Sequence, residues 1–223
     1  MMIGLSFDVE PDFPPYYNTN RGLEGLKKVC EILLKHKADA TFFICADFLE
    51  KNPGLLDYVK KFEIACHGFR HIDLRKLGDM QLEGEILEAV EIFEEFGLTP
   101  RGFRAPYAGV DSRVLTVLSK YFEYDSSLLF YQKKPEDADI KEVPIYTGGK
   151  TFGINPKLFN RTLDFPIENK VYFIHPWEYG GLDFKLIESK RKKMKLLGYS
   201  QENYLKNLET ILKEKPVRLS EMI

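Results

Sequence analysis

Two histidines four residues apart, His67 and His71, point more directly to chemistry than any other pair in this sequence. They lie in the run CHGFRH (66–71), which follows the short apolar segment 62–66. Residues four apart on a helical turn face the same way, and neutral imidazole is a good ligand for Zn²⁺. The pair therefore predicts a metal site, although solvated surface helices carry the same spacing.

Other ionisable side chains also follow short apolar runs. They are Asp8 and Glu10 after 2–7, Arg104 after 102–103, Asp125 after 121–124, and His175 after 171–174. Active sites of barrels and open α/β sheets lie at the carboxyl ends of parallel strands. We therefore expect these side chains to share one rim with the histidine pair, which is a stronger indication of a site than any single motif.

Strand and helix patterns alternate along the chain, which is typical of parallel βα units in an α/β fold. Apolar runs predict strands, and the main ones are 2–7, 40–45, 64–66, 143–145, 171–174 and 217–219. Helical spacing predicts helices at 23–36, 82–96, 112–120 and 199–213. About seven strands fit the length, and no linker interrupts the sequence, so we expect a single domain over residues 1–223.

Composition narrows the possible partners and the compartment. The net charge of −2 gives no general attraction to nucleic acid, and the basic run 190–195 fits a solvated helix face. No apolar stretch is long enough to span a membrane. Residues 1–5 lack the features of a secretory signal, and the three cysteines fit buried thiols in a reducing compartment. These features predict a cytoplasmic protein; its oligomeric state is not indicated.

Five motifs follow one another along the chain: SFD (6–8), HGFRH (67–71), RAPY (104–107), DSS (125–127) and YFIH (172–175). In this order they resemble one family, the polysaccharide deacetylases (NodB homology, carbohydrate esterase family 4). The segments DVE (8–10), GFRAP (102–106) and HPWE (175–178) are most similar to a subgroup associated with exopolysaccharide biosynthesis. The resemblance implies a distorted (β/α)7-type barrel of parallel strands.

It also implies an activity, which is metal-dependent removal of N-acetyl groups from N-acetylglucosamine-type sugars in a glycan or a biosynthetic intermediate. His67, His71 and one carboxylate would hold Zn²⁺, or another divalent metal such as Co²⁺, Mn²⁺ or Ni²⁺. This arrangement leaves positions for water and the substrate carbonyl. Asp8 would be the general base that activates the metal-bound water, and His175 the general acid for the leaving amine.

Four further residues receive roles from the same resemblance and its chemistry. Arg104 would pair with Asp8 and hold it ionised, and Asp125 would orient His175. The backbone N–H of Tyr107 would be an oxyanion donor. Trp177, two residues after His175, is the best-placed aromatic side chain for stacking on a sugar.

The third metal ligand departs from the family pattern, which has two adjacent aspartates in its first motif. Val9 stands where the ligand aspartate is expected. Strand alternation puts Asp8 and Glu10 on the same side, which favours Glu10 as the ligand. Asp12 is the alternative, because Pro11 could turn the chain back. A third arrangement has Asp8 binding the metal and Glu10 acting as base.

Structural roles compete with these assignments. Arg104 could form an ion pair that serves packing alone, Asp125 could cap a turn, and His175 could be a satisfied core histidine. At the level of function, two alternatives remain open. One is a hydrolase of another C–N bond, such as a cyclic imide or ureide; the other is a catalytically silent relative that binds carbohydrate.

Overall fold

The computed structural model describes residues 1–11, 21–180 and 197–223, and its centre is one parallel sheet. The strands in the described part are β1 (Met2–Val9), β2 (Thr41–Ile44), β3 (Glu63–Cys66), β4 (Gly102–Phe103), β5 (Tyr124–Asp125), β6 (Lys141–Glu142), β7 (Ile145–Gly148) and β8 (Asn169–Ile174). Their order across the sheet is β6-β5-β4-β3-β2-β1-β8-β7, and every pair is parallel.

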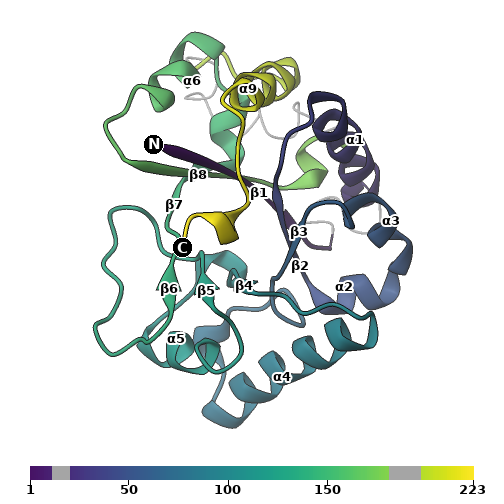
Figure 1. The fold of residues 1–223 in the computed structure, drawn as a ribbon, viewed down its shortest axis with the longest axis vertical. Helices are drawn as coiled ribbons and strands as arrows, with labels where there is room; N and C mark the ends of the chain where they lie inside the picture. Colours follow the sequence, from purple (N-terminus) through teal and green to yellow (C-terminus); the bar gives the residue numbers. More distant parts are fainter. Residues whose placement is uncertain (12–20, 181–196) are drawn as a thin grey trace.

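The sheet curls into a half-barrel, and the helices surround it on the outside (Figure 1). The α-helices in the described residues are α1 (Arg21–His36), α2 (Ala46–Lys51), α3 (Leu56–Val59), α4 (Asp79–Glu95), α5 (Ser112–Leu118), α6 (Pro156–Leu163) and α9 (Gln201–Lys213). The predicted α/β barrel architecture in one domain is thus confirmed. Right-handed crossover helices cover a parallel sheet in this way because both of its faces must be buried.

Strand β1 lies inside the sheet, between β2 and β8. From Ile3 to Val9 every residue is buried, as the apolar run 2–7 predicted. Phe7 stacks on Phe42 of β2 with ring centroids 5.1 Å apart. A strand buried this deeply holds its last residues in fixed positions, which is what the carboxylates at its end require.

Helix α1 packs against the short 3₁₀ turn η5 (Pro176–Glu178) that follows β8. Gly25 makes this approach possible, because a Cβ there would come within 1.8 Å of the carbonyl oxygen of Pro176. The helix therefore supports the turn that carries the sequence HPWE. Any larger side chain at position 25 would push the turn away.

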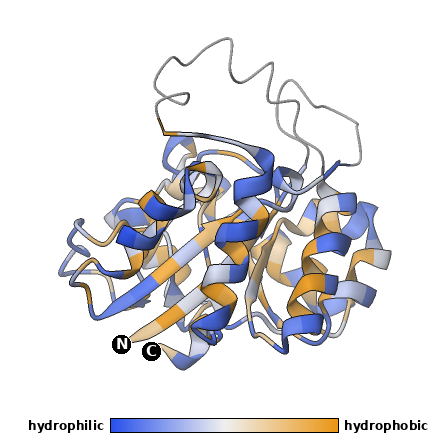
Figure 2. Ribbon diagram, turned by 90° about the horizontal axis from the view of Figure 1, so that it is seen from above, coloured by the Kyte–Doolittle hydropathy of each residue, from blue (hydrophilic) through white to orange (hydrophobic). Residues whose placement is uncertain are grey.

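Both termini lie at the end of the barrel where β1 begins, opposite the end where its carboxylates lie (Figure 2). Val217 forms an isolated parallel bridge with Gly4 of β1, so the end of the chain lies against its beginning.

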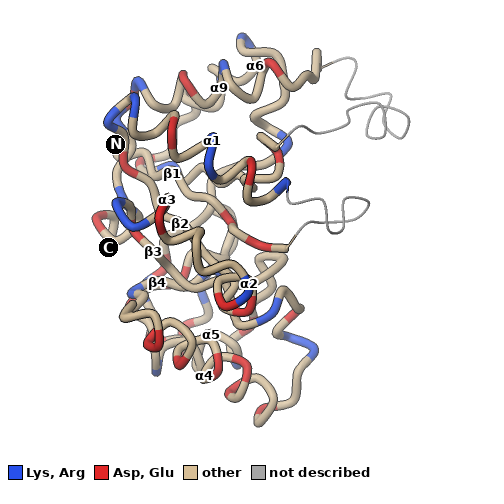
Figure 3. Tube along the Cα trace, turned by 90° about the vertical axis from the view of Figure 1, so that its right-hand side faces the viewer, with Lys and Arg blue, Asp and Glu red and all other residues tan. Residues whose placement is uncertain are grey.

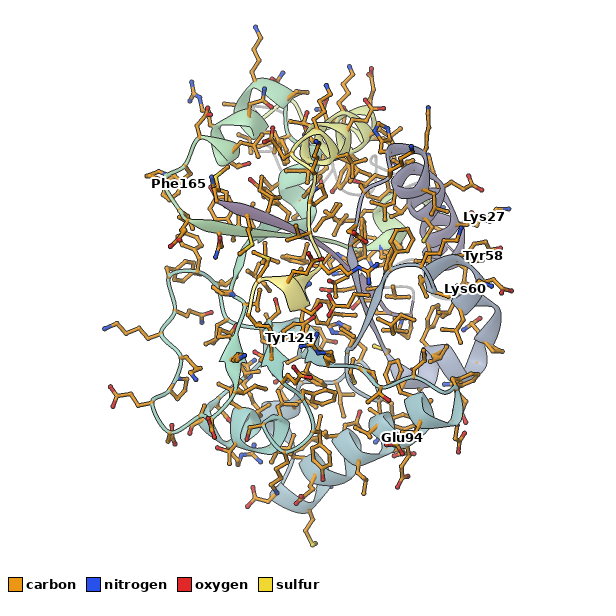
Figure 4. All side chains as sticks on the ribbon, in the orientation of Figure 1. Lys27, Tyr58, Lys60, Glu94, Tyr124 and Phe165 are labelled. Atoms are coloured by element: carbon orange, nitrogen blue, oxygen red, sulfur yellow. The ribbon has the colours of Figure 1, made fainter. Side chains whose placement is uncertain are left out.

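On the sheet, Tyr124 is fully buried near the middle of Figure 4, and its hydroxyl donates to Glu63 at 3.0 Å. Acidic and basic residues are mixed along the trace in Figure 3, in keeping with the small net charge.

Several boundaries differ from the sequence predictions. The described residues form eight strands, and the strand predicted at 143–145 falls between β6 and β7, with only Ile145 inside a strand. The predicted strand 217–219 is one bridge followed by the 3₁₀ turn η6 (Leu219–Glu221). Residues 12–20, including Asp12, and the basic run 190–195 lie outside the described residues. No helix in the described part is long and apolar enough to cross a membrane.

Candidate active site

Glu10, His67 and His71 come together just beyond the carboxyl ends of β1 and β3. Oε2 of Glu10 lies 2.6 Å from Nε2 of His71 and 3.6 Å from Nε2 of His67. One ligand atom from each residue lies within 4.8 Å of the other two. The structure thus gathers the three side chains that the sequence analysis proposed as metal ligands, while Asp12 lies outside the described residues.

A backbone contact orients His67. Its Nδ1 lies 2.7 Å from the carbonyl oxygen of Arg104, so Nδ1 carries the proton and donates. The other nitrogen of the ring, Nε2, faces Glu10. A second hydrogen bond that fixes the tautomer is a common feature of histidines that bind metals.

The loop between the two histidines is tied to helix α4. The backbone N–H of Arg70 donates to Glu85 at 2.6 Å, and the Arg70 guanidinium donates to the same carboxylate at 2.8 Å. Glu85 itself is buried. The ion pair therefore fixes the residue immediately before His71 and so limits where that ring can lie.

Electrostatics keep Glu10 ionised in its buried position. Burial alone would raise the pKa of its carboxyl, but the charge of His175 and hydrogen bonds from His67 and His71 hold the pKa well below its usual range. Its other oxygen, Oε1, accepts a hydrogen bond from the indole of Trp177 at 3.2 Å. Two imidazole nitrogens and an ionised carboxylate form a donor set that fits Zn²⁺ or a similar divalent cation.

Asp8 and Arg104 form a buried ion pair beside this cluster. Nη1 of Arg104 donates to Oδ1 of Asp8 at 2.7 Å and to Oγ of Ser6 at 2.8 Å. Nε donates to the carbonyl oxygen of Ser126 at 2.8 Å, and the guanidinium lies over the ring of Phe43 at 4.2 Å. The guanidinium is thus held on several sides, and it presents a fixed charge to Asp8.

His175 lies on the other side of Glu10. Its Nε2 is 3.7 Å from Oε1 of Glu10, and its ring stacks on Trp177 with centroids 4.7 Å apart. Burial would lower the pKa of this imidazole, but the charges of Glu10 and Glu178 outweigh that effect and raise the pKa to about 9. The ring is therefore readily protonated at neutral pH.

The prediction that Asp125 orients His175 is wrong. The oxygens of Asp125 accept hydrogen bonds from the backbone N–H and the hydroxyl of Ser127 at 2.9 and 2.7 Å. The carboxylate beside Nδ1 of His175 is instead Glu178, at 3.6 Å. Asp125 is on the two-residue strand β5 and points toward Glu142, and it supports the wall of the site instead of contacting the histidine.

Tyr107 lies in the 3₁₀ turn η3 (Pro106–Ala108) with a left-handed backbone, at φ 60°. Ala108 follows at φ 53°, and two such residues in succession store strain of about 1–2 kcal/mol each. The Tyr107 ring packs on His71 with centroids 4.5 Å apart. Strained turns of this kind are concentrated at functional sites, and this turn lines the cavity of the candidate site; the oxyanion role of the Tyr107 N–H stays a prediction.

A cavity of about 450 Å³ joins these groups. Its walls include every predicted site residue in the described chain except Asp125. Sequence reasoning missed other lining residues, which are Ala105, Ala108, Leu129, Ile145, Gly148, Gly149, Lys150, Phe173 and Glu178. Only Glu178 had a signal in the sequence, since it closes the motif HPWE three residues after His175.

Comparison with known families tests the resemblance that the five sequence motifs indicated. The sequence profile described as "Polysaccharide deacetylase" matches residues 1–122, which is more than half of the chain. The protein belongs to the polysaccharide deacetylase family. The resemblance inferred from the five motifs is confirmed, while the exopolysaccharide subgroup stays a prediction.

Individual members of the family agree with this placement. A peptidoglycan-N-acetylglucosamine deacetylase of Bacillus cereus is 30% identical over 138 residues, which cover 61% of this chain and 60% of that protein. A chitooligosaccharide deacetylase of Azorhizobium caulinodans is 33% identical over 97 residues, which cover 41% of this chain and 46% of the other. The chain thus spans only part of the length of these relatives.

Solved structures show the fold alone. A carbohydrate esterase family 4 pseudoenzyme from Bacillus anthracis superimposes with a TM-score of 0.65 at 17% identity, over 99% of this chain and 64% of that one. Membership of the polysaccharide deacetylase family therefore does not by itself guarantee activity. The site residues of this chain have to carry that argument.

Proposed function

We propose that this protein is a metal-dependent N-deacetylase that hydrolyses the acetamido group of N-acetylglucosamine-type sugars, in a glycan or a biosynthetic intermediate. The observation that carries the proposal is the position of Glu10, which lies between the His67–His71 pair on one side and His175 on the other. Asp8 and Arg104 line the same cavity. A cavity of about 450 Å³ is in the size range of small-molecule sites.

Glu10, His67 and His71 are the residues that would hold the metal. A divalent cation supplies a Lewis acid that polarises the acetyl carbonyl and makes water more acidic at neutral pH. The chain supports such a site in three ways: Glu10 is ionised, the contact with Arg104 turns Nε2 of His67 toward Glu10, and Glu85 fixes the loop that leads to His71.

Asp8 and His175 perform the proton transfers in this proposal. Asp8 accepts the proton of the water that attacks the acetyl carbonyl carbon, and Arg104 holds its carboxylate in position. His175 gives a proton from Nε2 to the sugar nitrogen as the C–N bond breaks. The products are acetate and a free amine. The N–H of Tyr107 is the oxyanion donor for the tetrahedral state.

The retained residues favour an active enzyme over a silent carbohydrate-binding relative. A buried Asp8–Arg104 pair and a buried carboxylate surrounded by three imidazoles cost desolvation energy, which folding alone does not require. Perturbed groups gathered in one cavity are typical of catalytic sites. We keep the ring-opening of cyclic imides as the second candidate, since Val9 replaces the second aspartate of the family motif.

Acetate release and metal content test the proposal together. Chelator-treated protein is reloaded with Zn²⁺, Co²⁺, Mn²⁺ or Ni²⁺ and assayed on N-acetylglucosamine oligomers and on a cyclic imide. We expect about one metal per chain and acetate release, both lost in Glu10→Gln. In Asp8→Asn we expect the metal to remain and the activity to be lost. Glu202→Gln, at an exposed ion pair on α9, is the matched control.

Each other outcome selects an alternative. Ring opening without acetate release would favour the cyclic imide hydrolase. Metal loss in Asp12→Ala, with Glu10→Gln still loaded, would move the third ligand to Asp12. Saturable sugar binding with no metal and no turnover would leave a silent carbohydrate-binding protein.

A further inference from the structure

Nδ1 of His175 is buried and has no hydrogen-bond partner among the described residues. Its other nitrogen, Nε2, faces Glu10 and the cavity. A histidine that delivers a proton from Nε2 needs a partner at Nδ1 that fixes the tautomer and stabilises the imidazolium. The nearest carboxylate in the ion pairs of the described residues is Glu178, whose Oε2 lies 3.6 Å from Nδ1.

Glu178 is held firmly enough to serve as that partner. Oε2 accepts the backbone N–H of His175 at 3.0 Å, which closes the turn η5 on itself. Oε1 accepts the hydroxyl of Tyr204 at 3.2 Å, and Tyr204 comes from the distant helix α9. The side chain is only 3% exposed. Two separate elements therefore fix both oxygens of one carboxylate.

His175 is the basic group that can neutralise the carboxylate of Glu178. Among the described residues, the ion pairs of the structure give it one basic partner, and that partner is His175. The backbone of Gly149, the residue after β7, also comes close, since a Cβ at this position would lie 3.4 Å from Oε1 of Glu178. A buried carboxylate without an opposite charge costs several kcal/mol, so this position is expensive unless the imidazole compensates for it.

We propose that Glu178 is the positioning residue of His175, and that it accepts a hydrogen bond from Nδ1–H so that Nε2 carries the proton toward the leaving amine. The proposal rests on the proposed deacetylase function and replaces the role first given to Asp125. The 3.6 Å separation is compatible with this role, because catalytic hydrogen bonds are often long in a structure without substrate. Tyr204 ties this pair to the C-terminal helix.

A comparison of two acetyl substrates separates positioning from simple structural support. The amine of an N-acetyl sugar must be protonated before it leaves, whereas the phenolate of 4-nitrophenyl acetate leaves without a proton. In Glu178→Gln, which keeps the size of the side chain and loses its charge, we expect kcat on N-acetylglucosamine oligomers to fall about 100-fold. We expect kcat on 4-nitrophenyl acetate, KM for both substrates and the metal content to change less than threefold.

Two further variants test the same role, one by removing an anchor of Glu178 and one as a control. Tyr204→Phe removes one anchor and keeps the carboxylate, so we expect a smaller fall in the same kcat, below tenfold. Glu202→Gln, an exposed glutamate two residues away on α9, should leave both activities unchanged. Equal losses on both substrates in Glu178→Gln, or unchanged amide turnover, would overturn the positioning role.

A spectroscopic measurement gives an answer that does not depend on turnover. The chain has four histidines, so ¹⁵N-labelled imidazoles can be assigned with one variant for each. We expect an exchange-protected proton on Nδ1 of His175 that disappears in Glu178→Gln. Its absence in the wild type would overturn the positioning role. If the proton is present and wild-type protein releases no acetate from either substrate, the proposed function fails while the Glu178–His175 pairing stands.

Discussion

The indole of Trp177 donates a hydrogen bond to Oε1 of Glu10 at 3.2 Å. Oε2, the other oxygen, is thereby the one that faces His67 and His71. A residue first considered as a platform for sugar stacking thus contacts the carboxylate of the candidate metal site directly. The same ring also stacks on His175, so it links the proposed ligand to the proposed acid.

Trp177→Phe should weaken metal binding. Phenylalanine keeps an aromatic ring beside His175 but cannot donate to Glu10, and loss of a partner that orients a ligand typically costs 10- to 100-fold in affinity. We expect Zn²⁺ affinity, measured by competition with a chromogenic chelator, to fall by about tenfold. An unchanged affinity with a raised KM for the sugar would instead identify Trp177 as the stacking platform.

Glu85→Gln should also weaken metal binding, through the loop that holds His71. The Glu85 carboxylate holds the backbone N–H and guanidinium of Arg70, next to His71. Loss of its charge should lower the free energy of unfolding by about 1–2 kcal/mol, since hydrogen bonds to charged groups contribute amounts of this order. It should also lower Zn²⁺ affinity.

The control for this change is Glu88→Gln, an exposed glutamate on the same helix. Urea unfolding and chelator competition are the two measurements. A loss of stability without any change in Zn²⁺ affinity would show that Glu85 supports the fold and has no influence on His71.

Arg104→Ala should be destabilising because it leaves Asp8 buried without a partner. Breaking a buried pair in this way typically costs 3–5 kcal/mol, and we expect a fall of about that size in the free energy of unfolding. The double variant Arg104→Ala with Asp8→Asn should recover part of the loss, because no unpaired charge remains. Urea unfolding of the four proteins measures the coupling; additive effects would mean that the pair is energetically weak.

The sequence was sufficient to predict which strand ends form the site. Each apolar run ends in a polar group, and parallel strands bring these ends to one rim, so Asp8, Glu10, His67 and Arg104 could be placed before the structure was known. Alternation along β1 also predicts that Glu10, and not Val9, faces His67 and His71. These inferences depend only on strand direction and period, which apolar patterns define well.

The partner of His175 could not be predicted in this way. Asp125 ends one strand and Glu178 follows another, but the direction of each side chain depends on short local turns. Asp125 is on a two-residue strand and bonds to Ser127, while the turn after β8 folds Glu178 back onto the backbone of His175. The same limit applies to β6 and β7, which pair with β5 and β8 at opposite edges of the sheet although only Val143 and Pro144 separate them in the sequence.

The half-buried Glu142 and the buried Asp125 form a pair of carboxyl groups that should hold a proton at neutral pH. Burial raises the pKa of both, that of Asp125 to about 6 and, with the added charge of Asp125, that of Glu142 to about 10. Oε1 of Glu142 accepts the backbone N–H of Leu128 at 3.1 Å. Oε2 has no donor partner among the described residues, as expected if it carries the proton itself and donates it to Asp125.

This shared proton makes stability depend on pH with a definite sign. Between the usual pKa of Glu, 4.5, and the raised value of about 10, the folded protein keeps a proton that the unfolded chain has lost. The free energy of unfolding therefore falls as pH rises, by at most about 1.4 kcal/mol per pH unit for one proton. The contribution is complete below the lower value and lost above the higher one.

Glu142→Gln should remove most of this dependence. Its amide N–H donates to Asp125 as the neutral carboxyl does, its oxygen still accepts from Leu128, and it has no proton to lose. Urea unfolding from pH 5 to pH 9 should give a flatter curve for the variant, which becomes more stable than the wild type toward pH 9. Glu123→Gln, in an exposed ion pair with Arg101, is the control and should follow the wild-type slope. Parallel curves for Glu142→Gln and the wild type would show that Glu142 is ionised in the folded protein and that the pair holds no shared proton.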